Sequence, residues 1–193
     1  EEKLLTAAER SLKTEQRLFS ELKDMLAGHI EELKTAAETL ASLDALVSLA
    51  QTAKKNNYVR PEIVEAGKPL DIVAGRHPVV ECVSEEQFVP NDCYMDAGEN
   101  RTLIITGPNM AGKSTYMRQV ALIVLMAHIG SFVPAKSAMI PVTDKIFTRI
   151  GASDSLISDQ STFMVEMNEV AAILRNATPN SLLILDEIGR GTS

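Results

Sequence analysis

The residues best suited to chemistry form a glycine-containing loop between an apolar run and a helical pattern. Glycine permits a tight turn around a phosphate, and N–H groups at the start of the next helix point at phosphate oxygens. In this pattern Lys113 reaches the β- and γ-phosphates, and the Ser114 hydroxyl ligates Mg²⁺. The loop therefore predicts binding of a nucleoside triphosphate. Its candidate contacts are Gly107, Pro108, Asn109, Met110, Ala111, Gly112, Lys113, Ser114 and Thr115.

Two adjacent carboxylates near the end of the sequence are the second candidate. Asp186 and Glu187 follow the four aliphatic residues 182–185. In a parallel sheet, the carboxyl end of such a strand lies beside the phosphate loop. Asp186 would then hold Mg²⁺ through water, and Glu187 would orient or deprotonate the attacking water. The alternative is a strand that simply enters an acidic loop, but together with Lys113 the pair predicts ATP hydrolysis.

Three other residues are candidates with open alternatives. Ser161 is at the start of a helical pattern, where it either caps the helix or meets a γ-phosphate, and its position does not indicate which nucleotide. Phe88 either packs in a core or stacks on an adenine base. Arg190 is an arginine finger, a subunit-interface residue or an ordinary surface arginine.

The elements that must position these residues begin with a long helical region. Residues 1–57 contain no proline and one glycine, and their apolar residues recur at steps of three and four. This spacing predicts helix with a coiled-coil-like seam. A break is expected at Gly28–His29, because glycine costs about 1 kcal/mol in a helix interior. Residues 58–101 contain short β-branched runs between prolines and glycines, and predict a β-rich lead-in with strands near 70–73 and 78–83.

Residues 102–193 alternate between strand and helix patterns. Strands are predicted at 103–106, 138–142, 145–150 and 182–185, and helices at 113–129 and 163–175. Alternation of this kind indicates an α/β sheet with helices packed against it. The phosphate loop and the carboxylate pair then both follow strands of one sheet.

Composition narrows the class of protein. The net charge of −7 is spread along the chain without a Lys/Arg cluster, so charge alone does not predict nucleic-acid binding. Cys82 and Cys93 have no metal-ligand spacing, which favours free thiols in a reducing, cytoplasmic setting. The first residues are charged and do not resemble a signal peptide. The longest apolar run, 120–127, is too short to span a membrane.

Four segments resemble the MutS family of bacterial DNA mismatch repair proteins. They are GRHPVVE at 75–81, the loop GPNMAGKST at 107–115, STFMVEM at 161–167 and LDEIGRGTS at 185–193. The resemblance covers essentially the whole chain, because the leading helices are similar to the end of the family's lever and core region where it enters the ATPase domain.

The resemblance implies a fold and a shared site. The fold would be α/β, a P-loop NTPase of the ABC ATPase type, truncated at its C-terminal side and preceded by a helical lever segment. Two subunits would share two composite nucleotide sites, with ATP or ADP and Mg²⁺ as cofactors. Phe88 would stack on the adenine, Ser161 would approach the partner subunit's nucleotide in trans, and the loop of Arg190 would lie at the dimer interface.

The resemblance also implies partners. In the family, ATP binding and hydrolysis switch a DNA clamp between mismatch search and sliding, and recruit MutL. The full-length protein would be a homodimer that is cytoplasmic and associated with the nucleoid. It would contact mismatched DNA through domains absent here. A fragment is expected, because the mismatch-reading domain, the connector, most of the clamp and the family's segments beyond Ser193 are missing.

Two alternatives remain at this point. The first is another ABC-type ATPase with helical arms, such as a MutS paralogue or an SMC-like protein, although Asn109–Met110 and residues 161–167 speak against it. The second is a nucleotide-gated interaction module in which the helical arm is the working part and no turnover occurs.

Overall fold

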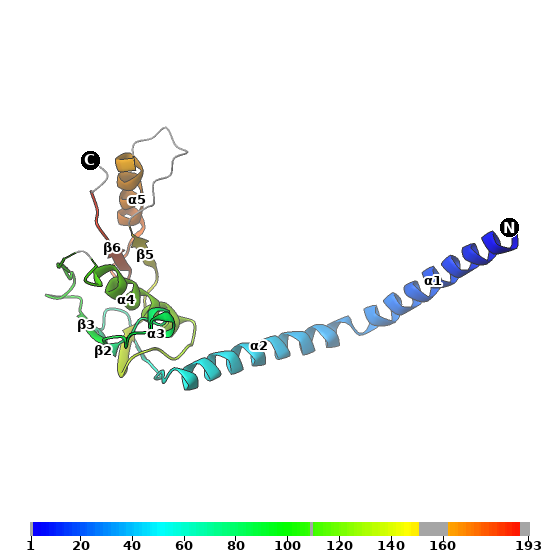
Figure 1. Ribbon diagram of the computed structural model, residues 1–193, viewed down its shortest axis with the longest axis horizontal. Coiled ribbons are helices and arrows are strands. Elements are labelled where there is room, and N and C mark those ends of the chain that lie inside the picture. The colour runs from blue at the N-terminus through cyan, green and yellow to red at the C-terminus, as the bar shows by residue number, and fades with distance from the viewer. Residues whose placement is uncertain (1, 109, 151–161, 190–193) are drawn as a thin grey trace. The chain divides into compact units, whose positions relative to one another are not determined.

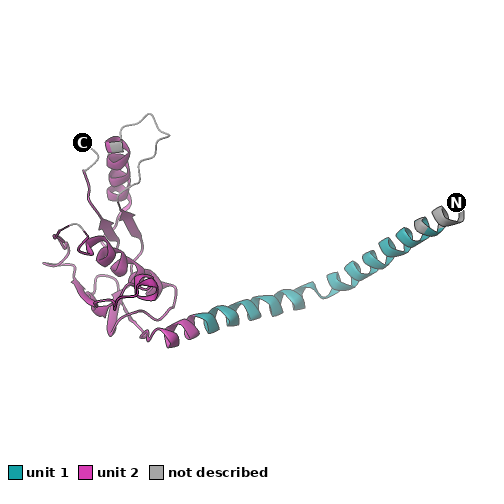
Figure 2. Cartoon of the chain, viewed as in Figure 1, with its two compact units in different colours: residues 1–48 teal, residues 49–193 magenta. Residues whose placement is uncertain are grey.

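The computed structural model describes residues 2–108, 110–150 and 162–189 (Figure 1). The chain divides into two compact units, residues 1–48 and 49–193 (Figure 2). Helix α1 covers Glu2–Gly28, and α2 begins at Ile30 and ends at Lys55. The predicted break at Gly28–His29 is confirmed, since His29 lies in a turn between the two helices. Apolar side chains along the predicted seam are exposed, among them Leu12, Phe19, Leu22, Leu26, Ile30, Leu33 and Leu40.

The described residues of the second unit form two small sheets. The larger has the strand order β1-β4-β2-β3, where β1 is Glu62–Val64, β2 is Leu70–Gly75, β3 is Asn91–Met95 and β4 is Ser137–Pro141. Strand β2 is antiparallel to both of its neighbours, whereas β1 and β4 are parallel. The smaller sheet pairs β5, Ile146–Arg149, in parallel with β6, Leu182–Leu185.

Helix α4, Lys113–His128, lies at the centre of the core of this unit. Its side chains Ile123 and Val124 are fully buried, and the same cluster contains Ile72 of β2 and Ile184 of β6. Full burial of an aliphatic side chain of this size contributes roughly 1.5–3 kcal/mol. The described residues of the unit also form α3, Val80–Val83, and α5, Thr162–Asn176, besides the last residues of α2. Helix α4 therefore connects the two sheets through its apolar face.

The predicted fold class is wrong, because the described residues do not form the single α/β sheet of a P-loop ATPase of the ABC type. Residues 103–106, the strand expected before the loop, form no strand, and Ile104 is 87% exposed. Within the described part of the chain, β6 pairs with β5 alone, and the four-stranded sheet is mainly antiparallel. A short apolar run does not determine its own pairing partner, because pairing depends on residues that are distant in the sequence.

Residues 78–83 also differ from the prediction, since 78 and 79 form a turn and Val80–Val83 form the short helix α3 in place of a strand. The Nδ1 atom of buried His77 accepts hydrogen bonds from the N–H groups of Val79 and Val80, at 3.3 and 3.2 Å. Such N–H groups have no partner within their own helix. The imidazole therefore caps α3, and this local hydrogen bonding outweighs the β propensity of the valines.

Burial of His77 predicts a pH-dependent stability. Burial lowers the pKa of His77 below its ordinary value of 6.5. The unfolded chain therefore binds a proton at a higher pH than the folded chain, and the free energy of unfolding falls as the pH drops below 6.5 toward the folded-state pKa. Urea unfolding measures this slope if it is carried out between about pH 7.5 and 5.5, a range that brackets the ordinary histidine pKa. The His77→Gln variant should show a smaller slope, and an equal slope in both proteins would contradict the assignment.

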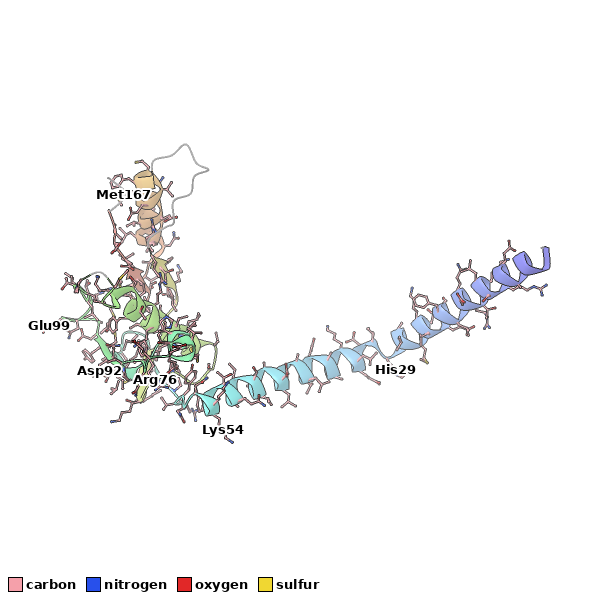
Figure 3. All side chains as sticks on the ribbon, in the orientation of Figure 1. His29, Lys54, Arg76, Asp92, Glu99 and Met167 are labelled. Carbon is pink, nitrogen blue, oxygen red and sulfur yellow. The ribbon has the colours of Figure 1, made fainter. Side chains whose placement is uncertain are left out.

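Arg76, labelled in Figure 3, connects the end of α2 to the larger sheet within the second unit. Its Nη2 donates a hydrogen bond of 3.0 Å to the carbonyl oxygen of Asn56, the residue after the last one of α2. Its Nε donates to Glu81 Oε2 at 2.6 Å. A cation near a helix C-terminus satisfies carbonyls that have no partner in the helix. The last turn of α2 is therefore fixed to the segment that follows β2.

Gly75, at the end of β2, packs too closely for any side chain. A Cβ there would lie 2.7 Å from Nε2 of the fully buried Gln119 and 2.8 Å from Cγ2 of Ile72. Overpacking of this kind costs about 1–3 kcal/mol, so we expect Gly75→Ala to lower the free energy of unfolding by that amount. Chemical denaturation checks the value. Gly98→Ala is the matched control, because its Cβ would meet only Asp96 Oδ1, at 3.4 Å; equal losses in both variants would contradict the explanation.

Candidate functional site

The loop before α4 has the backbone of an anion-binding turn. Gly112 has φ = +85°, in the left-handed region that favours glycine, and α4 begins at the next residue. Met110 is also left-handed, with φ = +65°. The Lys113 ammonium donates hydrogen bonds to the carbonyl oxygens of Gly107 and Pro108, at 2.8 and 2.7 Å. The positive charge therefore lies against the loop at the N-terminus of α4, where the helix dipole also favours an anion.

The carboxylate pair follows β6 directly. The Asp186 N–H donates to the Arg149 carbonyl at 2.8 Å, which continues the β5–β6 pairing by one residue. Asp186 is buried, whereas Glu187 is exposed. Glu187 has φ = +52°, a conformation uncommon for a residue other than glycine and often found at functional sites. The pair therefore combines a buried carboxylate, on backbone held by strand pairing, with one that is accessible to solvent.

The structure brings these two regions together in a cleft of about 390 Å³. This volume is within the usual range for small-molecule sites, about 300–1,000 Å³. One cleft thus combines an ammonium group at a helix N-terminus with two carboxylates, a donor set that suits phosphates together with Mg²⁺. Its lining residues are Leu103, Ile104, Ile105, Lys113, Met117, Leu185, Asp186, Glu187 and Ile188.

Other predicted site residues are not part of this cleft lining. Ser114 and Thr115 lie half-buried in the first turn of α4, and Met110 and Ala111 are exposed in the loop. Phe88 lies half-buried between α3 and β3 and does not line the cleft. Asn109, Ser161 and Arg190 lie outside the described residues. Of the predicted site residues, the structure therefore brings Lys113, Asp186 and Glu187 together in the cleft.

The apolar residues that line one side of the cleft were not predicted from the sequence. Residues 103–105 were expected inside a sheet, but they line the cleft instead. Met117 lies one helical turn after Lys113, so the spacing of four residues along the predicted helix was a signal for it. No comparable signal marks residues 103–105, because a buried strand and an apolar cleft wall have the same composition.

A larger cavity of about 500 Å³ is a weaker candidate. It shares Leu103, Ile105, Met117 and Leu185 with the cleft, but contains none of Lys113, Asp186 and Glu187. Among the residues that the structure describes, no group of three His, Cys, Asp or Glu side chains could hold a metal ion. Mg²⁺ would instead use one or two carboxylates together with phosphates and water, which is its usual mode. No helix in the described ranges is long and apolar enough to cross a membrane.

Comparison with known proteins assigns the family. A family model of MutS domain V matches residues 103–193, which include every lining residue of the cleft. The DNA mismatch repair protein MutS of Clostridioides difficile is 62% identical over 194 aligned residues, which cover 100% of this chain and 20% of the relative. The chain belongs to the MutS family.

Other members of the MutS family are nearly as similar. The MutS proteins of Acetivibrio thermocellus and Lachnoclostridium phytofermentans are each 59% identical over 100% of this chain, and the aligned region covers 22% and 21% of their own lengths. The chain therefore spans about a fifth of the length of these MutS relatives. The similarity also extends over α1, α2, β1, β2 and β3, which precede the range that the domain V model matches.

Proposed function

We propose that this chain binds ATP with Mg²⁺ in the cleft between α4 and β6 and hydrolyses it, as part of a DNA mismatch repair protein. The observation that carries the proposal is the joint lining of one cleft by Lys113, Asp186 and Glu187. An ammonium group at a helix N-terminus binds phosphate oxygens, and adjacent carboxylates supply a Mg²⁺ ligand and a base for water. The names of the MutS relatives supply the biological process.

The position and exposure of each residue indicate its role in binding and hydrolysis. Lys113 would bind the β- and γ-phosphates, and Ser114 and Asp186 would hold Mg²⁺. The bound ion would neutralise charge that develops on the phosphates. Exposed Glu187 would orient the attacking water and accept its proton, which requires access to solvent that buried Asp186 does not have.

For the full-length protein, the resemblance to the MutS family suggests how this site would be used. The nucleotide sites would be shared in a homodimer of the full-length protein, with Phe88 against the adenine, and Asn109 and Ser161 of the two subunits near the phosphates. Turnover would drive a DNA clamp that contacts mismatched DNA through other domains and recruits MutL. These partners are proposals for a protein of the relatives' full length.

Titration with a fluorescent ATP analogue, with and without Mg²⁺, tests the proposal on a protein of the relatives' full length that carries this sequence. We expect saturable, Mg²⁺-dependent binding with a dissociation constant within about 1 μM–1 mM, together with phosphate release. Binding without phosphate release would instead favour a nucleotide-gated module. Absence of binding at millimolar analogue would remove the proposal.

A further inference from the structure

Helix α5 (Figure 1) carries two carboxylates, one turn apart, that reach both sides of the Asp186–Glu187 pair. Glu166 is 5% exposed, and its Oε1 accepts a hydrogen bond of 2.8 Å from the Gly189 N–H. Glu169 Oε2 lies 2.8 Å from Arg149 Nε. The second contact is an ion pair in which the Nε–H is not aligned as a hydrogen bond.

These contacts fall on the two segments that flank the carboxylate pair. Gly189 is two residues after Glu187. Arg149 is paired with Leu185 across the β5–β6 ladder, and its carbonyl oxygen accepts the Asp186 N–H. Helix α5 therefore supports the turn after β6 directly through Glu166, and supports the end of β5 through Glu169.

The backbone between these supports has an uncommon conformation. Glu187 and Gly189 both have positive φ, at +52° and +85°. A left-handed residue other than glycine persists only where surrounding contacts hold it. Burying a carboxylate is also costly unless it is hydrogen-bonded. The Glu166–Gly189 hydrogen bond satisfies both conditions, because it pairs the buried Oε1 and holds the turn from its far side.

We infer that Glu166 is a positioning residue for ATP hydrolysis, which acts through the Gly189 N–H to fix the direction of the Glu187 carboxylate. The inference rests on the proposed function. Because Glu166 holds the turn at Gly189, its removal changes the placement of Glu187. Because Glu166 does not line the cleft, its removal leaves the phosphate contacts of Lys113 intact. Glu169 and Arg149 support the same turn from the side of β5.

Four variants in a full-length MutS protein that carries this sequence test the inference: Glu166→Leu, Glu166→Asp, Glu166→Gln and the control Asn168→Ala. Leucine removes the acceptor, and aspartate keeps the charge but is too short to reach Gly189. Glutamine keeps an oxygen acceptor, and Asn168 is an exposed residue of the same helix. The measurements are kcat, the dissociation constant of a fluorescent ATP analogue, and the thermal midpoint.

We expect kcat to fall by up to about 100-fold in the leucine and aspartate variants, since misplacement of about 1 Å has effects of this size. The dissociation constant should stay within about twofold, because the phosphate contacts are unchanged. Glu166→Gln should recover most of the lost kcat. Should the leucine variant not fold, the aspartate variant and the glutamine recovery decide the matter.

The outcomes separate the inference from the proposed function. If the wild-type protein does not hydrolyse ATP, the proposed function fails, whatever Glu166 does. If the wild type hydrolyses ATP and the leucine or aspartate variant keeps its kcat, the inference is overturned. Parallel losses of kcat, affinity and thermal midpoint in all four variants, including Asn168→Ala, would also overturn it, because they would show a purely structural role.

Discussion

Glu187→Gln is expected to leave ATP binding intact and to slow turnover by about 10²–10⁴-fold, the usual contribution of a general base. Glutamine has the shape of glutamate but cannot accept a proton from the attacking water. The residue lines the same cleft as Lys113 and Asp186 and is exposed, so the substitution should not disturb the core. Single-turnover phosphate release together with analogue binding measures both effects.

The control for this substitution is Glu99→Gln, an exposed glutamate that does not line the cleft. It should keep wild-type turnover, so any loss specific to Glu187 reports on chemistry and not on a change of net charge. Unchanged phosphate release in Glu187→Gln would remove the enzymatic role assigned to this residue and leave nucleotide binding as the function of the cleft.

Lys113→Met should weaken ATP binding by about 10- to 150-fold, because it removes charge-assisted hydrogen bonds to the phosphates worth about 1.5–3 kcal/mol. Methionine keeps much of the apolar stem of lysine, so packing beside Met117 in the cleft should persist. Isothermal titration with ATP and Mg²⁺ measures the affinity. The loss should shrink as salt is raised, because part of the attraction is electrostatic.

Lys136→Met provides the matched control, since Lys136 is exposed just before β4 and is not part of the cleft. It removes the same charge from the chain without touching the loop before α4. Equal losses of affinity in the two methionine variants would show that net charge, and not the position of Lys113, governs binding.

Elements with strong local signals were predicted close to their observed bounds. Helix α4 was expected at 113–129 and covers Lys113–His128, because a glycine precedes it and its apolar pattern is long. Strand β6 was expected at 182–185 and covers Leu182–Leu185, since four aliphatic residues are bounded by polar ones. In both cases the information lies within the segment itself.

Elements that depend on distant partners could not be predicted in this way. Strand β3, Asn91–Met95, has no apolar run, and it is held by its pairing with β2 and by the hydrogen bond from the Ala74 N–H to Asp92 Oδ1. Residues 103–106 have the apolar run but no partner strand in the described chain. The α/β sheet expected from alternation fails for this reason, since alternation describes order along the chain and not pairing.

In the candidate site, too, local patterns could be predicted from the sequence and contacts between distant residues could not. The two motifs were visible as local patterns, and the structure places Lys113 with Asp186 and Glu187, although their roles remain predictions. The support from Glu166 was not visible, because its contact with Gly189 links residues 23 positions apart through burial of a single carboxylate. Nothing in the composition of α5 distinguishes that carboxylate from one exposed to solvent.

The hydrogen bonds of Lys113 change what an ATP affinity measures. The ammonium already has two carbonyl acceptors in its own loop, Gly107 and Pro108. An arriving phosphate therefore enters by exchange: it must offer the ammonium better acceptors than those carbonyls, and the carbonyls must find new donors. The measured affinity is then the difference between two sets of hydrogen bonds. A loop with weaker hydrogen bonds to its own lysine would therefore bind nucleotide more tightly, without any new contact between protein and nucleotide.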